Sequence, residues 1–390
     1  MELHLSERRQ GLVPERGKPN TISVMPEANH VDRTEGVFVL VGTSKGLFIY
    51  ARDPASDEPW QVGGPYLAGR EIYAAMLDTR AGRRRLWVSA GSAHWGPGLA
   101  WSDDLGRTFT TPERAPIRFP EDTGLALTRV WQFLAPGDEP DLLYAGVEPA
   151  ALFISRDAGA TWELCRGLHD HPHRPDWQPG GGGLCLHTIV RNGGRLYCGI
   201  STAGVYRSDD GGATWQARNV GIRADFLAPG NQFPEFGQCV HKLVADPHRP
   251  DRLYLQHHGG VYRSDDAGDS WHAIGADLPS DFGFPIAVHP DDGDSLFVLP
   301  LEADSFRVTP EARLRVFRSR DGGRSFAALT EGLPQTEAYE CVLRDGLTSG
   351  PPGLYFGTRS GKVFGARDFD RFELLAGGLP PVLSVKTAVL

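Results

Sequence analysis

Short apolar runs separated by turn residues recur along almost the whole chain. Runs such as FVLVGT at 38–43 and RLYCGI at 195–200 are each followed closely by glycine, serine or proline. No long segment has the 3.6-residue apolar period of an amphipathic helix. Short runs of β-branched and aromatic residues bounded by turns predict an all-β chain, and they exclude a doubly wound α/β fold.

An eight-residue pattern, Ser-x-Asp-x-Gly-x-Thr/Ser-Trp/Phe, divides these strands into repeats. Two degenerate copies near Tyr50 and Ala366 bring the number of repeats to seven. A near-constant period of this length indicates an array of supersecondary units within one domain. The five intact copies are 53, 53, 56 and 55 residues apart and begin at Ser102, Ser155, Ser208, Ser264 and Ser319.

The aspartate of each intact copy suits a tight turn. A short carboxylate accepts backbone N–H bonds from its own turn, and the glycine after it supplies a positive φ. The terminal aromatic ring can anchor the hairpin between neighbouring sheets. Because one chain rarely needs the same catalytic group five times, we predict a structural role for Asp104, Asp157, Asp210, Asp266 and Asp321.

These octapeptides resemble the BNR or Asp-box repeat. Over residues 36–390 the chain resembles the Asp-box β-propellers, a superfamily that includes sialidases, xyloglucan-cleaving glycosidases, sortilin-type receptors and a photosystem II assembly factor. With seven repeats, the resemblance implies a single seven-bladed β-propeller of four-stranded antiparallel blades. It implies much less about activity, because proteins that share the repeat do unrelated things.

The strand pattern also predicts how the ring closes. The strand at 38–43 has no inner strand before it, and 384–390 has no strands after it, so the two are expected to pair and leave no open edge. Residues 1–35 are polar and aperiodic, which predicts a mobile tail. The expected inner strands are 72–78, 129–135, 186–191, 240–246, 284–290, 339–345 and 384–390.

Composition narrows the possible partners and the compartment. The net charge of −9 argues against a nucleic-acid or anionic membrane surface, and no apolar run is long enough for a membrane-spanning helix. The five cysteines are odd in number and have no CxxC spacing, so we expect free thiols in place of disulfides. Since residues 1–35 also lack the apolar stretch of a secretory signal, we predict a cytoplasmic protein.

The long connections are expected on one face of the ring. They are 113–128, 165–184, 216–238 and 301–313, and each exceeds an ordinary hairpin turn. Loops of this length often bind ligands, although they can also serve only to cap the ring. The sequence therefore predicts a small polar ligand or a protein partner at this loop face.

Aligned inner strands place one residue per blade near the mouth of the central channel. Equal register on a strand implies equal side-chain direction, so His187, His241 and Glu340 are expected in one polar pocket. With Tyr73 they are the catalytic candidates, the alternative being a solvated channel lining. The full set at this position is Tyr73, Trp131, His187, His241, Phe284, Glu340 and Lys386. The predicted ligand-binding residues are Trp131, Lys386, His94, Glu148, His257, Glu302 and Arg359.

Histidines raise the question of a metal. The HDHPH string contains His169, His171 and His173, and imidazole is a common ligand of transition metals. A histidine string in a proline-containing loop also fits a merely exposed polar segment. We predict no cofactor and no bound metal, with a His187, His241 and Glu340 metal site as the alternative.

Sialidase chemistry requires three arginines, a tyrosine with a glutamate partner, and an aspartate as acid and base. Sialidases as a family have six blades and an Arg-Ile-Pro motif before the first Asp box. Here the repeats number seven, and the nearest motif, Ile117-Arg118-Phe119-Pro120, follows the first intact box. Arg70, Arg129 and Arg359 nevertheless leave an analogous arrangement open. Xyloglucan-cleaving enzymes have two propellers that enclose the polysaccharide chain between them, whereas one propeller is expected here.

Three functions remain open. The first is a non-catalytic propeller that binds a small sugar-like or anionic ligand, or a protein. The second is a sialidase-like or other glycoside hydrolase acting at the channel mouth, where a pair of carboxylates would be needed. The third is a histidine-based, metal-dependent lyase or hydrolase.

Overall fold

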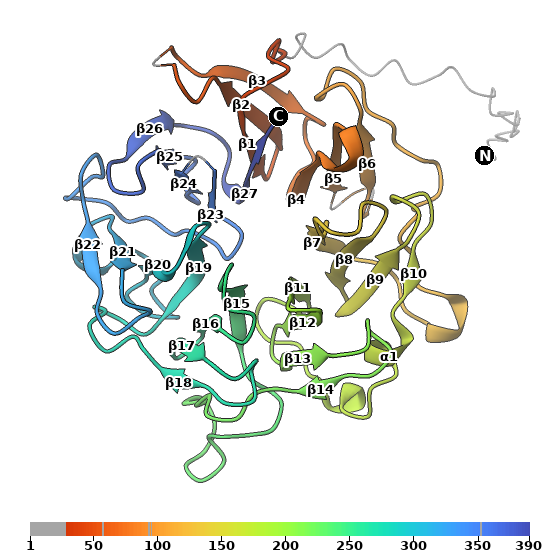
Figure 1. Cartoon of the computed structure of the whole chain (residues 1–390), viewed down its shortest axis with the longest axis vertical. Helices are drawn as coiled ribbons and strands as arrows, with labels where there is room; N and C mark the ends of the chain where they lie inside the picture. The colour runs from red at the N-terminus through yellow and green to blue at the C-terminus, as the bar shows by residue number, and fades with distance from the viewer. Residues whose placement is uncertain (1–28, 57, 93, 95, 352) are drawn as a thin grey trace, which may run out of the picture.

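Seven antiparallel sheets are arranged in a ring around one axis in the computed structural model of the chain (Figure 1). The structure describes residues 29–390 except positions 57, 93, 95 and 352. Six sheets have four strands, and the seventh has three strands followed by an isolated bridge between Trp101 and Thr110. The prediction of one seven-bladed β-propeller is confirmed.

The strands follow the repeats from blade to blade. The first blade contains β27 (Val382–Val389), β1 (Val37–Thr43), β2 (Gly46–Arg52) and β3 (Gln61–Tyr66). The second contains β4 (Glu71–Asp78), β5 (Arg85–Gly91) and β6 (Leu99–Ser102). The third contains β7 (Arg129–Leu134), β8 (Leu143–Glu148), β9 (Ala151–Ser155) and β10 (Glu163–Leu164).

The other four blades have the same order. The fourth contains β11 (Leu186–Asn192), β12 (Arg195–Ile200), β13 (Gly204–Ser208) and β14 (Gln216–Ala217). The fifth contains β15 (Val240–Ala245), β16 (Leu253–His257), β17 (Gly260–Ser264) and β18 (His272–Ala273). The sixth contains β19 (Gly283–His289), β20 (Asp292–Pro300), β21 (Val316–Ser319) and β22 (Ala327–Leu329). The seventh contains β23 (Leu347–Gly350), β24 (Gly353–Gly357), β25 (Val363–Ala366) and β26 (Glu373–Ala376).

Helical segments are short and lie in the connections. Among the described residues there is one α-helix, α1 (Arg166–His169), in the loop between the third and fourth blades. The 3-10 turns are Arg80–Gly82, Glu121–Thr123, Arg174–Asp176 and Pro310–Ala312. In the described part of the chain, no helix is long and apolar enough to cross a membrane.

The C-terminal strand closes the ring as predicted. Strand β27 pairs with β1, with Val385 opposite Val41 and Lys386 opposite Leu40. Beyond the ladder, Gly36 and Leu390 exchange two backbone hydrogen bonds of 2.9 and 3.0 Å. The first blade therefore combines the two ends of the described chain, with β27 as its inner strand.

The inner strand of the seventh blade differs from the prediction. Residues 339–345 are not a strand, and the ladder with β24 is formed by β23 instead. The apolar alternation around Glu340 and Val342 suggested a strand, but Gly346 N–H turns back to the Leu343 carbonyl and interrupts it. The true inner strand carries Thr348 and Ser349, which line the channel, so its polarity concealed it.

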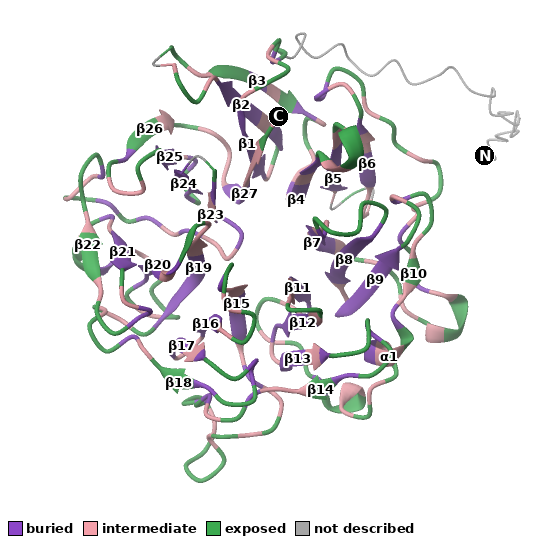
Figure 2. Ribbon diagram, viewed as in Figure 1, coloured by how far each residue is buried: buried purple, intermediate pink, exposed green. Residues whose placement is uncertain are grey.

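Burial is concentrated in the strands, and most of the chain's exposed residues lie in the connections (Figure 2). Aromatic residues join adjacent blades: Tyr197 donates a hydrogen bond of 3.2 Å to the Ala267 carbonyl of the next Asp box. Tyr254 donates one of 2.7 Å to the Gly293 carbonyl of the following blade. These fully buried tyrosines pack between sheets and satisfy their hydroxyl groups at the same time.

Each intact Asp box is a closed network of hydrogen bonds. In the fourth blade, Asp210 Oδ1 accepts bonds from the Ser208 hydroxyl at 2.8 Å and the Thr214 N–H at 2.9 Å. Asp210 Oδ2 accepts the Thr214 hydroxyl at 2.6 Å. The Gly212 N–H donates to Ser208 Oγ at 2.8 Å. Equivalent bonds surround Asp104, Asp157, Asp266 and Asp321.

The N-terminal boundary lies earlier than residue 36. Of the expected tail, residues 1–28 lie outside the described residues. Asn29 forms an antiparallel bridge with Gly64, and the Val31 side chain is buried in the core between the first and second blades. Packed structure therefore already begins before the predicted start of the propeller.

Candidate functional site

The inner strands bulge at the position where the channel residues were aligned. In the fourth blade, Leu186 pairs with Ile200 and Thr188 with Gly199, which leaves His187 as an extra residue. The equivalent shifts in other blades lie at Tyr73–Ala74, Trp131, His241 and Phe284–Pro285. A bulged residue leaves the regular alternation of side chains, so equal register does not imply equal direction here.

In the first blade, the position of the bulge shows that the predicted alignment of the inner strand was wrong. The shift between Gly42 and Thr43 leaves Leu383 as the extra residue of β27. Leu383, and not the predicted Lys386, is therefore the residue that takes this position. Leu383 also lines the axial cavity described below, whereas Lys386 faces the other end of the channel.

His187 is a core residue. Its ring is fully buried, and Nε2 donates a hydrogen bond of 3.0 Å to the Val240 carbonyl of the next blade. The other nitrogen, Nδ1, lies 3.1 Å from the Thr188 hydroxyl. Burial lowers the pKa of His187 well below its usual value, and Arg344 and Lys242 act in the same direction. A buried, hydrogen-bonded and neutral imidazole fits a link between blades better than a catalytic base.

Glu340 is held away from the histidines. Its carboxylate accepts bonds from Lys362 Nζ at 2.8 Å and the Ser360 hydroxyl at 2.6 Å. Burial opposes ionisation, but these bonds outweigh it and lower the pKa of Glu340. His241 instead bonds to Gly283 and packs against Phe284. The expected pocket formed jointly by His187, His241 and Glu340 is therefore not assembled.

A cavity of about 300 Å³ lies at the loop-side mouth of the channel. Its walls come from the second, third, seventh and first blades, and the long loop 165–184 reaches it through two glycines. The lining residues are Tyr73, Arg129, Trp131, Gly181, Gly182, Leu343, Arg344, Asp345 and Leu383. Tyr73 and Trp131 were predicted as site residues, whereas Arg344 was not.

One wall of this axial cavity is a hydrogen-bonded cluster. Glu148 Oε2 accepts bonds of 3.1 Å from both Arg129 and the Trp131 indole N–H. The Arg129 guanidinium also lies over the Tyr73 ring, 4.1 Å from its centroid. Burial raises the pKa of Tyr73, with Arg129 opposing the shift. Glu148 thus orients the arginine and the indole, and its oxygen is already occupied by donors.

The floor of the cavity is a buried ion cluster. Asp345 Oδ1 accepts Lys242 Nζ at 2.8 Å and Lys386 Nζ at 2.6 Å. Burial disfavours the carboxylate, but the two ammonium groups outweigh it and hold the pKa of Asp345 far below its usual value. Burial also lowers the pKa of Lys242 to about 8. The two lysines line a separate cavity of about 310 Å³ at the opposite mouth, so the cluster divides the channel.

Arg344 lines the axial cavity and lies close to two aromatic rings. Its Cζ atom is 5.7 Å from the Trp131 ring centroid and 5.5 Å from that of Phe284. Its Nε atom is buried without a hydrogen-bond partner. Within residues 29–390, apart from the four undescribed positions, the structure shows no carboxylate or carbonyl bound to this guanidinium. An unpaired guanidinium between aromatic faces is well suited to binding an anionic group.

The remaining predicted ligand-binding residues are scattered. His257 is fully buried, and burial lowers its pKa to about 3. Its Nδ1 accepts the Gly259 N–H at 3.1 Å. His94, Glu302 and Arg359 are exposed and do not line the axial cavity. Lys386 belongs to the floor cluster. Of the predicted set, Tyr73, Trp131 and Glu148 are brought together.

The HDHPH loop folds against the fourth blade. The His171 and His173 rings are 4.5 Å apart, and His173 Nδ1 lies 3.1 Å from the Tyr206 hydroxyl. Among the described residues, the one group of three side chains with metal-ligand spacing is Cys239, His241 and His258. The sequence signal for this group was the spacing Cys239-x-His241, but Cys239 lies just before β15 and His241 is the bulged residue of that strand. No local pattern marked Arg344, which lies in the segment 339–345 that was wrongly predicted to be a strand.

Comparisons with known proteins agree with this fold. A family model described as "Sortilin, neurotensin receptor 3" matches residues 203–342. Two curated relatives match partially. An oligoxyloglucan-reducing end-specific xyloglucanase of Emericella nidulans is 28% identical over 152 residues, 36% of this chain and 17% of that protein. A probable enzyme of the same name from Neosartorya fischeri is 24% identical over 181 residues, 45% of this chain and 19% of that protein. The matched region thus spans less than a fifth of either relative.

Solved structures share the propeller at low sequence identity. A GH74 enzyme of Niastella koreensis has a TM-score of 0.57 at 18% identity, covering 90% of this chain and 56% of that one. A putative 6-phosphogluconolactonase of Bacteroides fragilis has a TM-score of 0.53 at 10% identity, covering 92% and 99%. YCF48 bound to a D1 peptide has a TM-score of 0.50 at 12% identity, covering 89% and 87%. At these identities the likeness supports the fold alone.

Proposed function

We propose that the axial cavity of this seven-bladed propeller, whose octapeptides resemble the BNR or Asp-box repeat, binds a small anionic ligand of the sugar-acid or sugar-phosphate type. The observation that carries this proposal is the unpaired guanidinium of Arg344 between the rings of Trp131 and Phe284. A buried donor without an acceptor costs roughly 1–3 kcal/mol, and more when charged. A carboxylate or phosphate oxygen of a ligand would satisfy it.

The balance of charge in the cavity favours the same class of ligand. Glu148 is bound by Arg129 and Trp131, and Asp345 is bound by two lysines. The local carboxylates are therefore already neutralised, which leaves Arg344 with an uncompensated positive charge. A ligand anion would meet little repulsion and a partly desolvated donor, the condition in which charge-assisted bonds are strong.

The aromatic walls suit the rest of such a ligand. Tyr73 and Trp131 contact each other with 4.9 Å between ring centroids and border the cavity beside Leu383. Flat apolar faces beside a few fixed polar groups are typical of small-molecule sites, and 300 Å³ lies at the small end of their range. A monosaccharide-sized ligand with one acidic group would match both features.

Binding of matched ligand pairs tests the proposal. Calorimetric titration should detect hexuronic acids or hexose phosphates, while the corresponding neutral hexoses bind at least about tenfold more weakly, a difference of about 1.4 kcal/mol. Raising the salt concentration should weaken the binding of the anionic ligands more than the binding of the neutral ones. Equal affinity for neutral and acidic sugars would contradict an anion site at Arg344.

A glycoside hydrolase is the second candidate, favoured by the partial match to xyloglucanases. Such an enzyme usually needs one carboxylic acid that is protonated and one carboxylate. In the axial cavity, Asp345 is held ionised by Lys242 and Lys386, and Glu148 accepts bonds from two N–H donors. Neither group is placed to donate a proton, so this candidate requires an acid from outside the cavity.

Release of sugar distinguishes the candidates. The full chain would be incubated with xyloglucan oligosaccharides and with chromogenic glycosides, and the reducing ends formed would be measured. Turnover that is lost in Glu148→Gln but retained in the exposed variant Glu302→Gln would favour the hydrolase. Binding without turnover would favour the ligand-binding propeller.

A further inference from the structure

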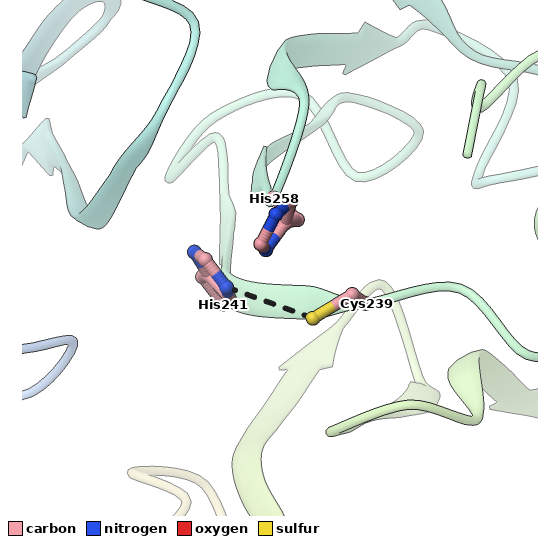
Figure 3. A group of neighbouring side chains, drawn as sticks. All are labelled: Cys239, His241 and His258. Atoms are coloured by element: carbon pink, nitrogen blue, oxygen red, sulfur yellow. Dashed lines mark hydrogen bonds between the residues drawn. The ribbon is translucent and has the colours of Figure 1, made fainter. Parts of the chain in front are cut away.

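We infer that Cys239, His241 and His258 form a transition-metal site, with Zn²⁺ as the ion that fits best. One ligand atom from each residue lies within 4.8 Å of the other two. Figure 3 shows the three side chains converging from two neighbouring backbone segments. The site differs from the axial cavity, because none of its residues lines that cavity.

The backbone of the fifth blade creates this arrangement. Cys239 and His258 lie just beyond the ladder of β15 and β16, which ends with Val240 opposite His257. The His258 N–H donates to the Cys239 carbonyl at 3.0 Å, so these two residues are cross-strand neighbours. Facing residues of an antiparallel pair have Cβ atoms about 5 Å apart. Two of the three ligands are therefore placed by paired strands, which are more rigid than a free loop.

The β-bulge supplies the third ligand. His241 is the extra residue of β15, and its Nε2 lies 3.7 Å from Cys239 Sγ (Figure 3). In a tetrahedral zinc site, N–Zn and S–Zn bonds of about 2.0 and 2.3 Å place such ligand atoms roughly 3.5 Å apart. The existing separation is thus close to the bound geometry, and the spread within the trio can be closed by small side-chain rotations.

The hydrogen bonds of His241 leave the correct nitrogen available. Nδ1 lies 2.5 Å from the Gly283 carbonyl, which can only accept, so Nδ1 carries the proton. Nε2 then presents a lone pair toward Cys239. Metal-binding histidines typically donate their other N–H to a carbonyl or carboxylate in this way, which fixes the tautomer and the ring orientation. Burial lowers the pKa of His241 well below its usual value, which keeps the ring neutral.

His258 closes the site on the solvent side. Its Nε2 is 3.5 Å from Asp304 Oδ2, and its ring packs against Phe282 with 5.1 Å between centroids. The side chain remains 28% exposed, so an ion can enter here while His241 is buried behind it. The Asp304 carboxylate adds negative charge beside the site and can orient the His258 ring.

The ligand set selects the ion. One thiolate and two imidazoles suit Zn²⁺ and copper better than Mg²⁺ or Ca²⁺, which require oxygen ligands. Copper electron-transfer sites commonly add a weak axial methionine, and Met76, the methionine among the described residues, packs in the core of the second and third blades. Binding converts the Cys239 thiol to a thiolate and releases its proton, while water completes the fourth position.

Reconstitution of the full chain tests this site. After removal of metal with a chelator, Zn²⁺ or Co²⁺ would be added and the bound metal counted by mass spectrometry. We expect one equivalent per chain, and with Co²⁺ a sulfur-to-metal charge-transfer band that disappears in Cys239→Ser. His258→Ala should weaken Zn²⁺ binding at least about tenfold, because even the removal of a residue that only hydrogen-bonds to a metal ligand typically lowers metal affinity by that factor. Circular dichroism would verify that each variant is folded.

Matched variants separate this site from other thiols and histidines. Cys341→Ser replaces another partly buried cysteine, and His171→Ala alters the HDHPH loop. Both should retain the metal and the charge-transfer band. Asp304→Asn should weaken Zn²⁺ binding without removing the band. Absence of metal in the wild-type chain, full retention in Cys239→Ser, or loss in His171→Ala would overturn the assignment.

Discussion

The guanidinium of Arg344 lies 5.7 Å from the ring centroid of Trp131. Trp131 belongs to β7 of the third blade, whereas Arg344 precedes β23 of the seventh, so the contact joins two distant blades across the channel (Figure 1). The cation–π attraction holds the guanidinium in place without consuming its hydrogen bonds. Arg344 is therefore positioned by the propeller and still free to bind an anion.

Asp345 is expected to stabilise the folded protein strongly at neutral pH. Asp345→Asn would leave Lys242 buried without its carboxylate, at a cost of about 3–5 kcal/mol in the free energy of unfolding. Adding Lys242→Met to the same chain should recover much of this loss. Urea unfolding of the three proteins at pH 7 measures both effects, and an unchanged midpoint in Asp345→Asn would contradict the role of the cluster.

The same cluster predicts a pH dependence. Burial lowers the pKa of Lys242 from 10.5 to about 8 in the folded protein, so the unfolded chain binds more protons between these values. Stability should therefore rise with pH from about 8 to 10.5 through this group, because the folded form is no longer penalised for a buried charge. The free energy of unfolding of the wild type and of Lys242→Met, measured across that range, should differ in slope. Parallel curves would contradict the lowered pKa.

Asp210 should stabilise the protein only where it is ionised. The side-chain bond from Thr214, with the Thr214 N–H and Ser208, lowers the pKa of Asp210 from 3.8 to about 2. This contribution is present above pH 4 and is lost as the pH falls toward 2. Asp210→Asn should therefore lower the melting temperature at pH 7 and have a smaller effect near pH 2. Ligand binding should be unchanged, because the Asp-box turns lie beside the turns that join the first two strands of the blades and not in the axial cavity. In the fifth blade, for example, the Ala267 N–H of the Asp box donates a bond of 2.8 Å to the Asp251 carbonyl, in the turn between β15 and β16.

Closure of the ring should depend on β27. A chain ending at residue 381 loses Val382, Leu383 and Val385, which are all buried, and exposes the edge of β1. Burying an aliphatic side chain contributes roughly 1.5–3 kcal/mol, so the loss should approach or exceed the stability of an ordinary domain. Circular dichroism and denaturant unfolding of the truncated chain check this. A wild-type unfolding midpoint would mean that the ring does not depend on this strand.

The repeats carry almost all the information needed for the fold. Ser-x-Asp spacing and the orphan strands 38–43 and 384–390 are local features, and their hydrogen bonds form as the pattern predicts. The prediction of an inner strand at 339–345 was wrong because it relied on the alternation of apolar residues there. The actual strand contains Thr348 and Ser349, which are polar because they line the channel.

The site was harder to predict because it depends on bulges. Alternation along a strand assigns His187 and His241 to one pocket, but an extra residue at each position turns the rings toward the next blade. Lys386 was aligned three residues away from Leu383 for the same reason. Arg344 lies in an irregular segment whose position depends on packing against blades far away in the sequence, so no local pattern marks it.

Calorimetric titration of an acidic sugar into the wild type, Arg344→Gln and Arg371→Gln tests the central claim most directly. Arg371 is exposed and forms an ion pair with Glu331 at the outer edge, so it controls for the loss of one positive charge. The account predicts binding to the wild type and Arg371→Gln, and affinity at least about tenfold lower in Arg344→Gln, equivalent to about 1.4 kcal/mol or more. Unchanged affinity in a folded Arg344→Gln protein would contradict the assignment of the axial cavity as the anion site.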